Sequence, residues 1–174
     1  MNDYGLIVIG GSWGGMSAVS RLFRSLPPEL DVPMAVALHR APEPSALSSL
    51  LQGYSHMKVV EALDKQPIER GRIYIAPPDY HLLIQPGWMS LSIDERVHYA
   101  RPSIDVLFES AADAYGERLI GIILTGANED GAAGLARVKE LGGVAVIQDP
   151  ASAERHEMPG AALAATSAAD AVLP

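Results

Sequence analysis

The sequence contains no cysteine among its 174 residues. This absence excludes disulfide bonds, thiolate ligands for a metal ion and a cysteine nucleophile. Covalent catalysis by this chain would therefore have to use a Ser, Thr, Asp, Glu, Lys, His or Tyr side chain.

Basic residues are scarce, because 13 Lys and Arg stand against 21 Asp and Glu and leave a net charge of −8. With a pI near 5.0, the chain lacks the clustered positive charge that nucleic-acid binding requires. Residues 1–4 lack the basic and apolar regions of a signal peptide, and no apolar run approaches the roughly 18 residues of a membrane span. The sequence thus predicts a cytoplasmic protein with no nucleic-acid partner and no direct membrane insertion.

Hydrophobic residues are plentiful, at 48% of the chain. At roughly 100–200 residues per domain, this length predicts one domain with a sizeable buried core. Pro and Gly are spread along the chain as turn residues, and neither a repeat nor a linker stands out. We therefore expect residues 1–174 to form a single domain.

Short apolar segments alternate with segments of helical periodicity. Strands buried on both faces are predicted at residues 5–10, 34–38, 119–124 and 144–147, with a brief strand at 59–60. Helices are predicted over residues 16–26, 47–51, 104–114, 131–141 and 159–171. This alternation predicts an α/β fold with a doubly wound, mostly parallel sheet between two helical layers, a three-layer α/β/α arrangement.

Two local signals refine this picture. Ser45 and Ser103 precede predicted helices and are candidate N-caps. Between residues 72 and 93, short apolar segments are separated by Pro77-Pro78 and Pro86-Gly87, which is typical of antiparallel hairpins. We expect this region to be an antiparallel addition to the sheet.

A glycine-rich turn, residues 10–15, follows the first predicted strand and fits the pattern G-x-S-x-G with Ser12 at its centre. Glycines permit the strained backbone of such a strand–turn–helix, and the unpaired N–H groups of the helix would lie near a developing oxyanion. Ser12 is therefore a candidate nucleophile. The alternative is a glycine-rich anion site with Ser12 as a helix cap, although neither the Walker A nor the G-x-G-x-x-G pattern is met.

A serine nucleophile needs a base, and candidates stand at the carboxyl ends of two other predicted strands. His39 follows residues 34–38, and Asp130 lies just beyond residues 119–124, beside Glu129. Because carboxyl ends of parallel strands share one sheet edge, Ser12, His39 and Asp130 are predicted to form a Ser-His-Asp triad.

His156 offers a competing base, because Ser12, Asp130 and His156 follow the chain order of α/β-hydrolases. Only eleven residues precede Ser12, however, and that fold places several strands before its nucleophile. We therefore favour His39. His56, His81 and His98 are weaker candidates, and since their spacing matches no metal-binding pattern, neither a metal nor a cofactor is predicted.

Ordered matches along nearly the whole chain resemble the catalytic domain of the chemotaxis protein-glutamate methylesterases, the CheB family. The loop 11–15 resembles that family's G-x-S-T-G-G, and His39 falls at its Q-H-M-P histidine. Further similar segments are residues 61–64, 71–77, 81–82, 101–108 (R-P-S-I-D-V-L-F), 124–134 (L-T-G-A-N-E-D-G-A-A-G), 148–149, 158–159 and 172–174.

The resemblance implies hydrolysis of methyl-esterified glutamates on cytoplasmic helices of chemoreceptors, with release of methanol, and in many members deamidation of receptor glutamines. It implies Ser12 as nucleophile, His39 as general base and then acid, and Asp130 as the residue that orients His39. It also implies that family members often carry an N-terminal receiver domain. This chain opens at the first predicted strand, so we expect no receiver domain and either a stand-alone enzyme or a fragment.

Three residues near the predicted site depart from the family pattern. Trp13 replaces a Thr, Ala127 replaces a Met, and Arg40 replaces the Met after the catalytic histidine. We expect these residues at the oxyanion hole and the substrate mouth. They motivate one alternative, a non-catalytic module that binds a receptor or transferase. A second alternative is an esterase that acts on small molecules with the same triad.

Overall fold

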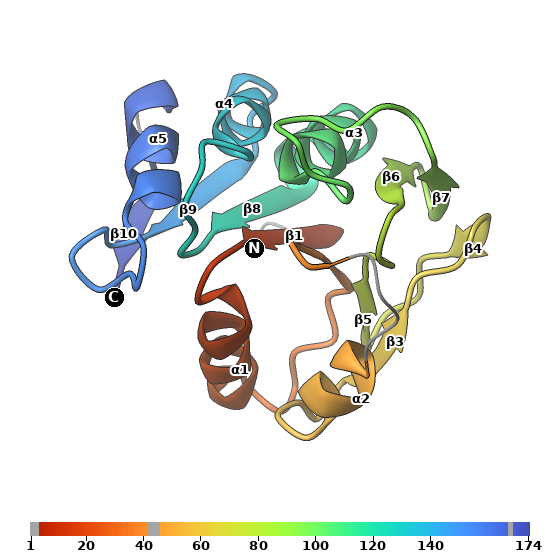
Figure 1. Cartoon of the computed structure of the whole chain (residues 1–174). Coiled ribbons are helices and arrows are strands. Elements are labelled where there is room, and N and C mark those ends of the chain that lie inside the picture. Colours follow the sequence, from red (N-terminus) through yellow and green to blue (C-terminus); the bar gives the residue numbers. More distant parts are fainter. Residues whose placement is uncertain (1–3, 42–45, 167–168) are drawn as a thin grey trace.

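A seven-stranded, wholly parallel sheet forms the centre of the computed structural model, which describes residues 4–41, 46–166 and 169–174 (Figure 1). The strand order is β10-β9-β8-β1-β2-β5-β3. The bounds are β1 Leu6–Gly11, β2 Met34–Leu38, β3 Lys58–Glu61, β5 Arg72–Ile75, β8 Leu119–Ile123, β9 Val144–Gln148 and β10 Ala171–Leu173.

Helices cover both faces of this sheet, as the doubly wound prediction requires (Figure 1). One face carries α1 (Gly15–Ser25) and α2 (Leu47–Gln52). The opposite face carries α3 (Ile104–Tyr115), α4 (Ala132–Glu140) and α5 (Glu157–Ala165), and a short 3-10 turn, η1 (Gly116–Arg118), follows α3.

Side-chain alternation along β1 joins the sheet to both helical layers. Leu6 and Val8 pack into the core under α3 and α4, whereas Ile7 and Ile9 pack into the core under α1. Successive strand residues point to opposite faces, so a strand covered on both sides must be apolar throughout. The predicted α/β/α fold is therefore confirmed.

The antiparallel addition is smaller than predicted. It consists of β4 (Gln66–Pro67), β6 (His81–Gln85) and β7 (Trp88–Ser92), in the order β4-β7-β6, with Gly87 at φ 83° in the β6–β7 turn. Residues 72–75, which the turn signals had grouped with this hairpin, instead form β5 and pair in parallel with β2 and β3. The reason is burial: Ile73, Tyr74 and Ile75 are enclosed on both faces, as only a central strand would be.

The C-terminal prediction also needs correction, because the helix expected at 159–171 begins at Glu157 and ends at Ala165. Pro159 is tolerated in the first turn, where its missing N–H has no helical partner. Residues 171–173 form β10, which pairs with β9. Ser103 caps α3 as predicted, whereas Ser45 lies outside the described residues.

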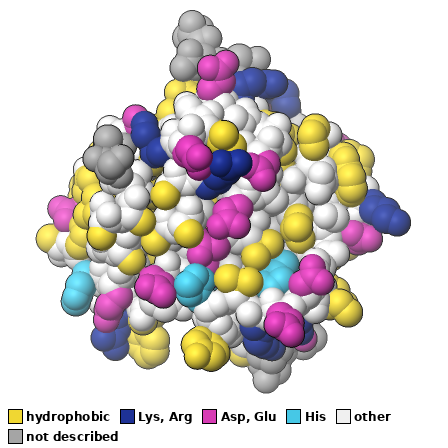
Figure 2. All heavy atoms as spheres, turned by 90° about the horizontal axis from the view of Figure 1, so that it is seen from above, with side chains coloured by type: hydrophobic (Ala, Val, Ile, Leu, Met, Phe, Trp, Pro, Cys, Tyr) yellow, Lys and Arg dark blue, Asp and Glu magenta, His cyan; other side chains and the backbone are white. Residues whose placement is uncertain are grey.

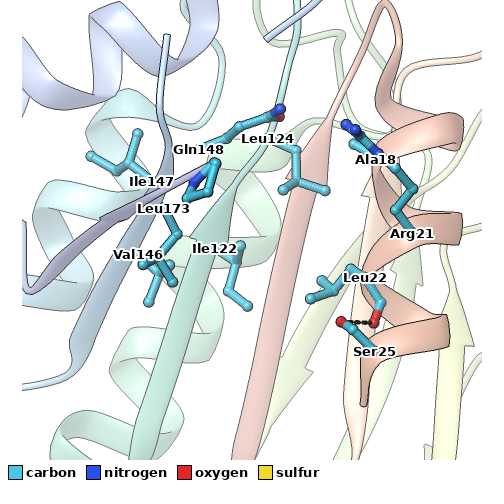
Figure 3. A pocket seen from close by; sticks show the side chains of 11 residues that line it. Ala18, Arg21, Leu22, Ser25, Ile122, Leu124, Val146, Ile147, Gln148 and Leu173 are labelled. Carbon is cyan, nitrogen blue, oxygen red and sulfur yellow. Dashed lines mark hydrogen bonds between the residues drawn. The ribbon is translucent and has the colours of Figure 1, made fainter. Parts of the chain in front are cut away.

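On the face of the sheet that carries α1, part of the surface next to β9 and β10 is not covered by a helix, because α4 and α5 lie on the opposite face. A groove of about 560 Å³ remains between α1 and these strands (Figure 3). Its walls are apolar, with Leu22 on α1 facing Ile122, Leu124 and Val146 on the sheet, and Arg21 is its one ionisable lining residue among those described. None of the described helices is both long and apolar enough to cross a membrane.

Candidate active site

Ser12 lies directly beyond the carboxyl end of β1, in the turn that leads into α1. Its N–H donates to the Thr125 carbonyl at 2.9 Å, and its own carbonyl accepts from Gly15 N at 2.8 Å. Gly14 adopts φ 77°, and a Cβ there would meet Glu154 and Thr125 atoms at 2.7–3.0 Å. Local sterics therefore require glycine in this turn and leave Ser12 partly exposed at the sheet edge.

His39 follows β2 and is held beside this turn. Its N–H donates to the Gly11 carbonyl at 3.1 Å, and its Nε2 lies 2.6 Å from Asp130 Oδ2. The Asp130 side chain is fully buried, whereas that of His39 keeps 13% of its surface exposed. The structure thus pairs His39 with Asp130 as the sequence predicted. Glu129 is exposed and points to His98 instead, with 3.6 Å between Oε1 and Nδ1.

Asp130 binds the start of α3 with both carboxylate oxygens. Oδ1 accepts from Ser103 Oγ and Asp105 N, each at 2.9 Å, and Oδ2 accepts from Ile104 N at 2.7 Å. Burial alone would raise the pKa of Asp130, but the hydrogen bonds from His39 and these backbone N–H groups outweigh it and lower the pKa. Asp130 is therefore ionised and can orient and stabilise a protonated His39.

Asp105 repeats this arrangement at the start of α4. Its Oδ1 accepts from Gly131 N at 2.9 Å and Gly134 N at 2.7 Å, and its Oδ2 lies 3.0 Å from His98 Nε2. Burial and the nearby Asp130 charge raise the pKa of Asp105 despite these backbone bonds. Asp130 thus caps α3, which carries Asp105, and Asp105 caps α4, which begins next to Asp130. Each of the two carboxylates also contacts a histidine.

The nitrogen of His39 that remains for catalysis is Nδ1, because Nε2 is committed to Asp130. Asn128 Nδ2 donates to Nδ1 at 3.4 Å, and Asn128 Oδ1 accepts from Asp130 N at 3.1 Å. Within the described part of the chain, Ser12 Oγ has no hydrogen bond to His39. The structure therefore places Ser12 on the adjacent strand end without closing the Ser–His bond, a frequent state of substrate-free sites.

Of the three residues predicted at the oxyanion hole and substrate mouth, Trp13 and Ala127 lie beside Ser12, and Arg40 lies beside His39. Trp13 and Ala127 follow Ser12 and Gly126, and no acceptor among the described residues binds their backbone N–H groups. The Trp13 indole contacts the segment after β9: its Nε1 donates to Glu154 Oε1 at 2.9 Å, and the Arg155 guanidinium lies 5.3 Å from its ring. These two peptide N–H groups are thus available to an anion near Ser12.

Arg40 is bound at the carboxyl ends of two other strands. Its Nη2 donates at 3.0 Å to the carbonyl of Ala76, which follows β5, and at 3.2 Å to Glu61, the last residue of β3. Arg40 and His39 also line a hollow of about 220 Å³, and most of the other residues that line it lie in the segment 96–102. Arg40 therefore belongs to the surroundings of His39.

The other histidines lie elsewhere. His156 is exposed at the start of α5, and among the described residues its side chain forms no hydrogen bond. His81 is buried, with Nε2 at 2.9 Å from the Glu95 carbonyl and Nδ1 accepting from Ser103 N at 3.1 Å. The geometry therefore favours His39 over His156 as the partner of Asp130, and His81 supports the start of α3.

A metal ion is poorly suited to this network, although ligand atoms of His98, Asp105 and Asp130 lie within 4.8 Å of one another. All four carboxylate oxygens already face N–H or O–H donors. A cation would have to displace hydrogen bonds that cap α3 and α4.

Sequence reasoning missed Asn128 and Asp105 as parts of the site, and it gave His98 only as a weaker candidate than His39. Asn128 lies in the same segment as Asp130, and Asp105 stands two residues after the predicted cap Ser103. An acidic residue in a first helical turn is an ordinary dipole signal, so its contact with a second helix could not be inferred from spacing.

Figure 2 shows one face of the molecule, on which Asp and Glu side chains are scattered among Lys and Arg rather than gathered in one patch. A serine, a histidine and a buried aspartate at three adjoining strand ends are typical of serine hydrolases that use a triad. The CheB methylesterase family model matches residues 7–174, and the chain belongs to this family.

Individual relatives agree with this assignment. The crystal structure of the Thermotoga maritima CheB methylesterase catalytic domain superposes with a TM-score of 0.91 at 32% identity, covering 98% of this chain and 93% of that one. A Leptospira interrogans protein, provisionally named a protein-glutamate methylesterase/protein-glutamine glutaminase, is 47% identical over 167 residues, 95% of this chain and 86% of its own length. A Caulobacter vibrioides protein named protein-glutamate methylesterase/protein-glutamine glutaminase 2 is 38% identical over 97% of this chain, but the chain spans only 50% of its length.

Proposed function

We propose that this chain is a serine esterase that removes methyl groups from glutamate side chains of chemoreceptors and releases methanol. The observation that carries the proposal is the buried His39–Asp130 pair, 2.6 Å from Nε2 to Oδ2, at the strand end next to Ser12. The activities named for the relatives support it, and deamidation of receptor glutamines is the second reaction that the same site would perform.

In the first half-reaction His39 Nδ1 takes the proton of Ser12 Oγ while that oxygen attacks the ester carbonyl carbon. Asp130 stabilises the imidazolium through Nε2–H, and its lowered pKa keeps it ionised in that role. His39 Nδ1–H then protonates the methoxide as the C–O bond breaks, so methanol leaves and the glutamyl group stays on Ser12.

In the second half-reaction water replaces methanol. His39 Nδ1 takes a proton from water, the resulting hydroxide attacks the acyl carbon, and Ser12 Oγ recovers the proton as the ester bond breaks. The product is a glutamate carboxylate. With a glutamine substrate the leaving group is ammonia, and the remaining steps are the same.

The oxyanion of each tetrahedral intermediate would be bound by the backbone N–H groups of Trp13 and Ala127. Both flank Ser12 and have no other acceptor among the described residues, and removal of one such donor typically costs about 10²–10³ in kcat.

Because His39 Nδ1 has one lone pair, the Asn128 amide must release it before Ser12 can bind there. The 3.4 Å length of the Asn128 contact favours that release.

The partners follow from this substrate. We infer that the chain acts in the cytoplasm on methylated cytoplasmic helices of chemoreceptors, and that its mechanism uses neither a metal nor another cofactor. Several relatives, such as the Caulobacter protein, extend well beyond the matched region.

The decisive experiment compares Ser12→Ala with Ser17→Ala, because Ser17 is an exposed serine of α1 outside the site. Methanol release from a methylated receptor should fall at least about 10³-fold in Ser12→Ala and stay at the wild-type rate in Ser17→Ala. Equal turnover by wild type and Ser12→Ala would refute the mechanism.

Labelling with a serine-directed fluorophosphonate separates the two alternatives. A non-catalytic receptor-binding module would bind receptor without labelling at Ser12. A small-molecule esterase would label, and it would hydrolyse simple esters faster than methylated receptor.

A further inference from the structure

The hollow beside His39 has an unusual lining for an acidic protein. Its volume is about 220 Å³, and its ionisable lining residues are Arg40, Arg96, Arg101, His39 and His98, besides Tyr99. The residues that form it, all within the described chain, include no Asp or Glu, although the whole chain carries a net charge of −8. The carboxylates that pair with these side chains, Glu61, Asp79, Asp105, Glu129 and Asp130, do not line the hollow. A negatively charged group in the hollow would thus meet guanidinium and imidazole groups first.

The arginines of this hollow are not equivalent. Arg101 is largely buried and donates to Asp79 Oδ1 and to the carbonyls of Ile93 and Asp94. Arg96 keeps 48% of its side chain exposed and reaches the same Asp79 oxygen through Nη2 at 2.8 Å. One carboxylate oxygen therefore serves two guanidinium groups, which leaves one excess positive charge among these three side chains. The other donors of Arg96 have no acceptor among the described residues.

The rim of the hollow is a strained turn. Val97 and Ala100 exchange backbone hydrogen bonds of 3.1 and 2.9 Å, and between them His98 and Tyr99 have φ values of 48° and 61°. A left-handed conformation costs a non-glycine residue roughly 1–2 kcal/mol, and such strain clusters at functional sites. His98 is held by its 3.0 Å contact with Asp105, whereas Tyr99 is 97% exposed.

We propose that this hollow is a carboxylate subsite, in which Arg96 binds an acidic side chain of the substrate and Tyr99 packs against its methylene groups. The inference rests on the proposed function and adds a substrate preference to it. Arg is the side chain best suited to bidentate binding of a carboxylate. Residues three or four positions apart on a helix have Cβ atoms about 5–6 Å from each other. A Glu one turn from the esterified residue would therefore enter the hollow when the ester lies between Ser12 and His39.

The test uses two methylated receptor peptides that differ only in having Glu or Gln one helical turn from the ester. Wild-type protein should hydrolyse the Glu peptide with a kcat/KM about 10-fold higher, mainly through KM, which corresponds to about 1.4 kcal/mol. Arg96→Gln should reduce this ratio to about 1, and Tyr99→Ala should reduce it in part. Arg137→Gln is the matched control, because Arg137 is similarly exposed and ion-paired but lies on α4 outside the hollow.

A binding measurement keeps this test independent of turnover. Calorimetry with Ser12→Ala should give the same preference for the Glu peptide, and the double variant Ser12→Ala/Arg96→Gln should lose it. A preference that survives Arg96→Gln, or equal binding of both peptides by Ser12→Ala, would overturn the subsite. Failure to release methanol from either peptide, with the binding preference intact, would count against the esterase assignment alone.

Discussion

Two histidine–aspartate pairs lie side by side in this molecule, and they differ in what surrounds them. His39–Asp130 and His98–Asp105 each join an imidazole Nε2 to a buried carboxylate, at 2.6 and 3.0 Å. In each pair the carboxylate also accepts backbone N–H groups from the start of a helix. Among the described residues, a hydrogen bond to the Ser12 turn is formed by the first pair alone, from His39 N to the Gly11 carbonyl.

Their electrostatics also differ. Burial would raise the pKa of both aspartates, but Asp130 ends with a lowered pKa and Asp105 with a raised one. Asp130 gains the shorter bond to its histidine, whereas the Asp130 charge adds to the cost of ionising Asp105. A histidine–aspartate bond is therefore a poor sign of catalysis by itself. The two pairs differ in the neighbouring Ser12 turn and in the direction of the aspartate pKa shift.

The largest expected difference comes from removing each imidazole. His39→Gln should lower kcat/KM for methyl-ester hydrolysis at least about 10³-fold, because the Ser12 proton then has no acceptor. His98→Gln, the matched variant, should cost less than about 10-fold. The readout is methanol release by both proteins on one receptor peptide, and comparable losses would show that the pairs act as one unit.

Replacing each aspartate by asparagine should also lower the hydrolysis rate to different extents in the two pairs. In Asp130→Asn the new amide would donate to His39 Nε2 and move the imidazole proton to Nδ1, so hydrolysis should fall by about 10³–10⁴-fold. Asp105→Asn keeps an oxygen for Gly131 N and Gly134 N, and we expect a loss below about 10-fold. Steady-state rates with circular dichroism of both variants check this, and a folded Asp130→Asn protein of normal activity would contradict the triad.

The pH dependence of stability should have opposite signs at the two aspartates. The lowered pKa of Asp130 stabilises the fold above its unfolded value of about 3.9, and this contribution is lost as the pH falls through the folded pKa. Asp105, whose folded pKa is raised, disfavours the fold at neutral pH, and this penalty is relieved as acidification protonates it.

Urea unfolding between pH 3 and pH 7 measures this contrast. Relative to wild type, Asp130→Asn should lessen the loss of free energy of unfolding below about pH 4. Asp105→Asn should make the loss of stability on acidification larger, since it removes the compensating relief. Identical pH profiles for the two variants would mean that the aspartates titrate as one coupled group.

The smallest expected effect concerns the turn that carries His98. Tyr99→Gly should raise the free energy of unfolding by about 0.5–1 kcal/mol, because relief of the left-handed strain exceeds the added entropy of the unfolded chain. The thermal midpoint measures it, with Tyr80→Gly as a comparison at another exposed tyrosine outside the strained turn. A lower midpoint in Tyr99→Gly would indicate that the turn is not strained.

Much of the fold was predictable because periodicity reports burial. The strands at 34–38 and 144–147 and the cap Ser103 were read from local pattern alone. Residues 72–75 were misassigned because prolines on their C-terminal side mark a turn without saying whether the preceding strand joins the main sheet. The strand at 171–173 was missed because its alanine-rich approach has high helix propensity, and its pairing with β9 is a tertiary effect.

The site was predictable to the extent that it depends on strand ends. His39 and Asp130 come together because parallel strands bring their carboxyl ends to one edge. The contacts of Asp105 and Asn128 depend on how α3 and α4 pack and on one side-chain rotamer, and no local signal encodes either of these.

The exchange of caps between Asp105 and Asp130 has a consequence for cooperativity. The amide protons of Ile104 and Asp105 at one helix start, and of Gly131 and Gly134 at the other, are bound by carboxylates 25–29 positions away in the sequence. Neither helix start can open without releasing the carboxylate that holds the other. In hydrogen exchange these four amides should behave as one unit, so the part of the molecule that orients His39 opens and closes together with the docking of two helices.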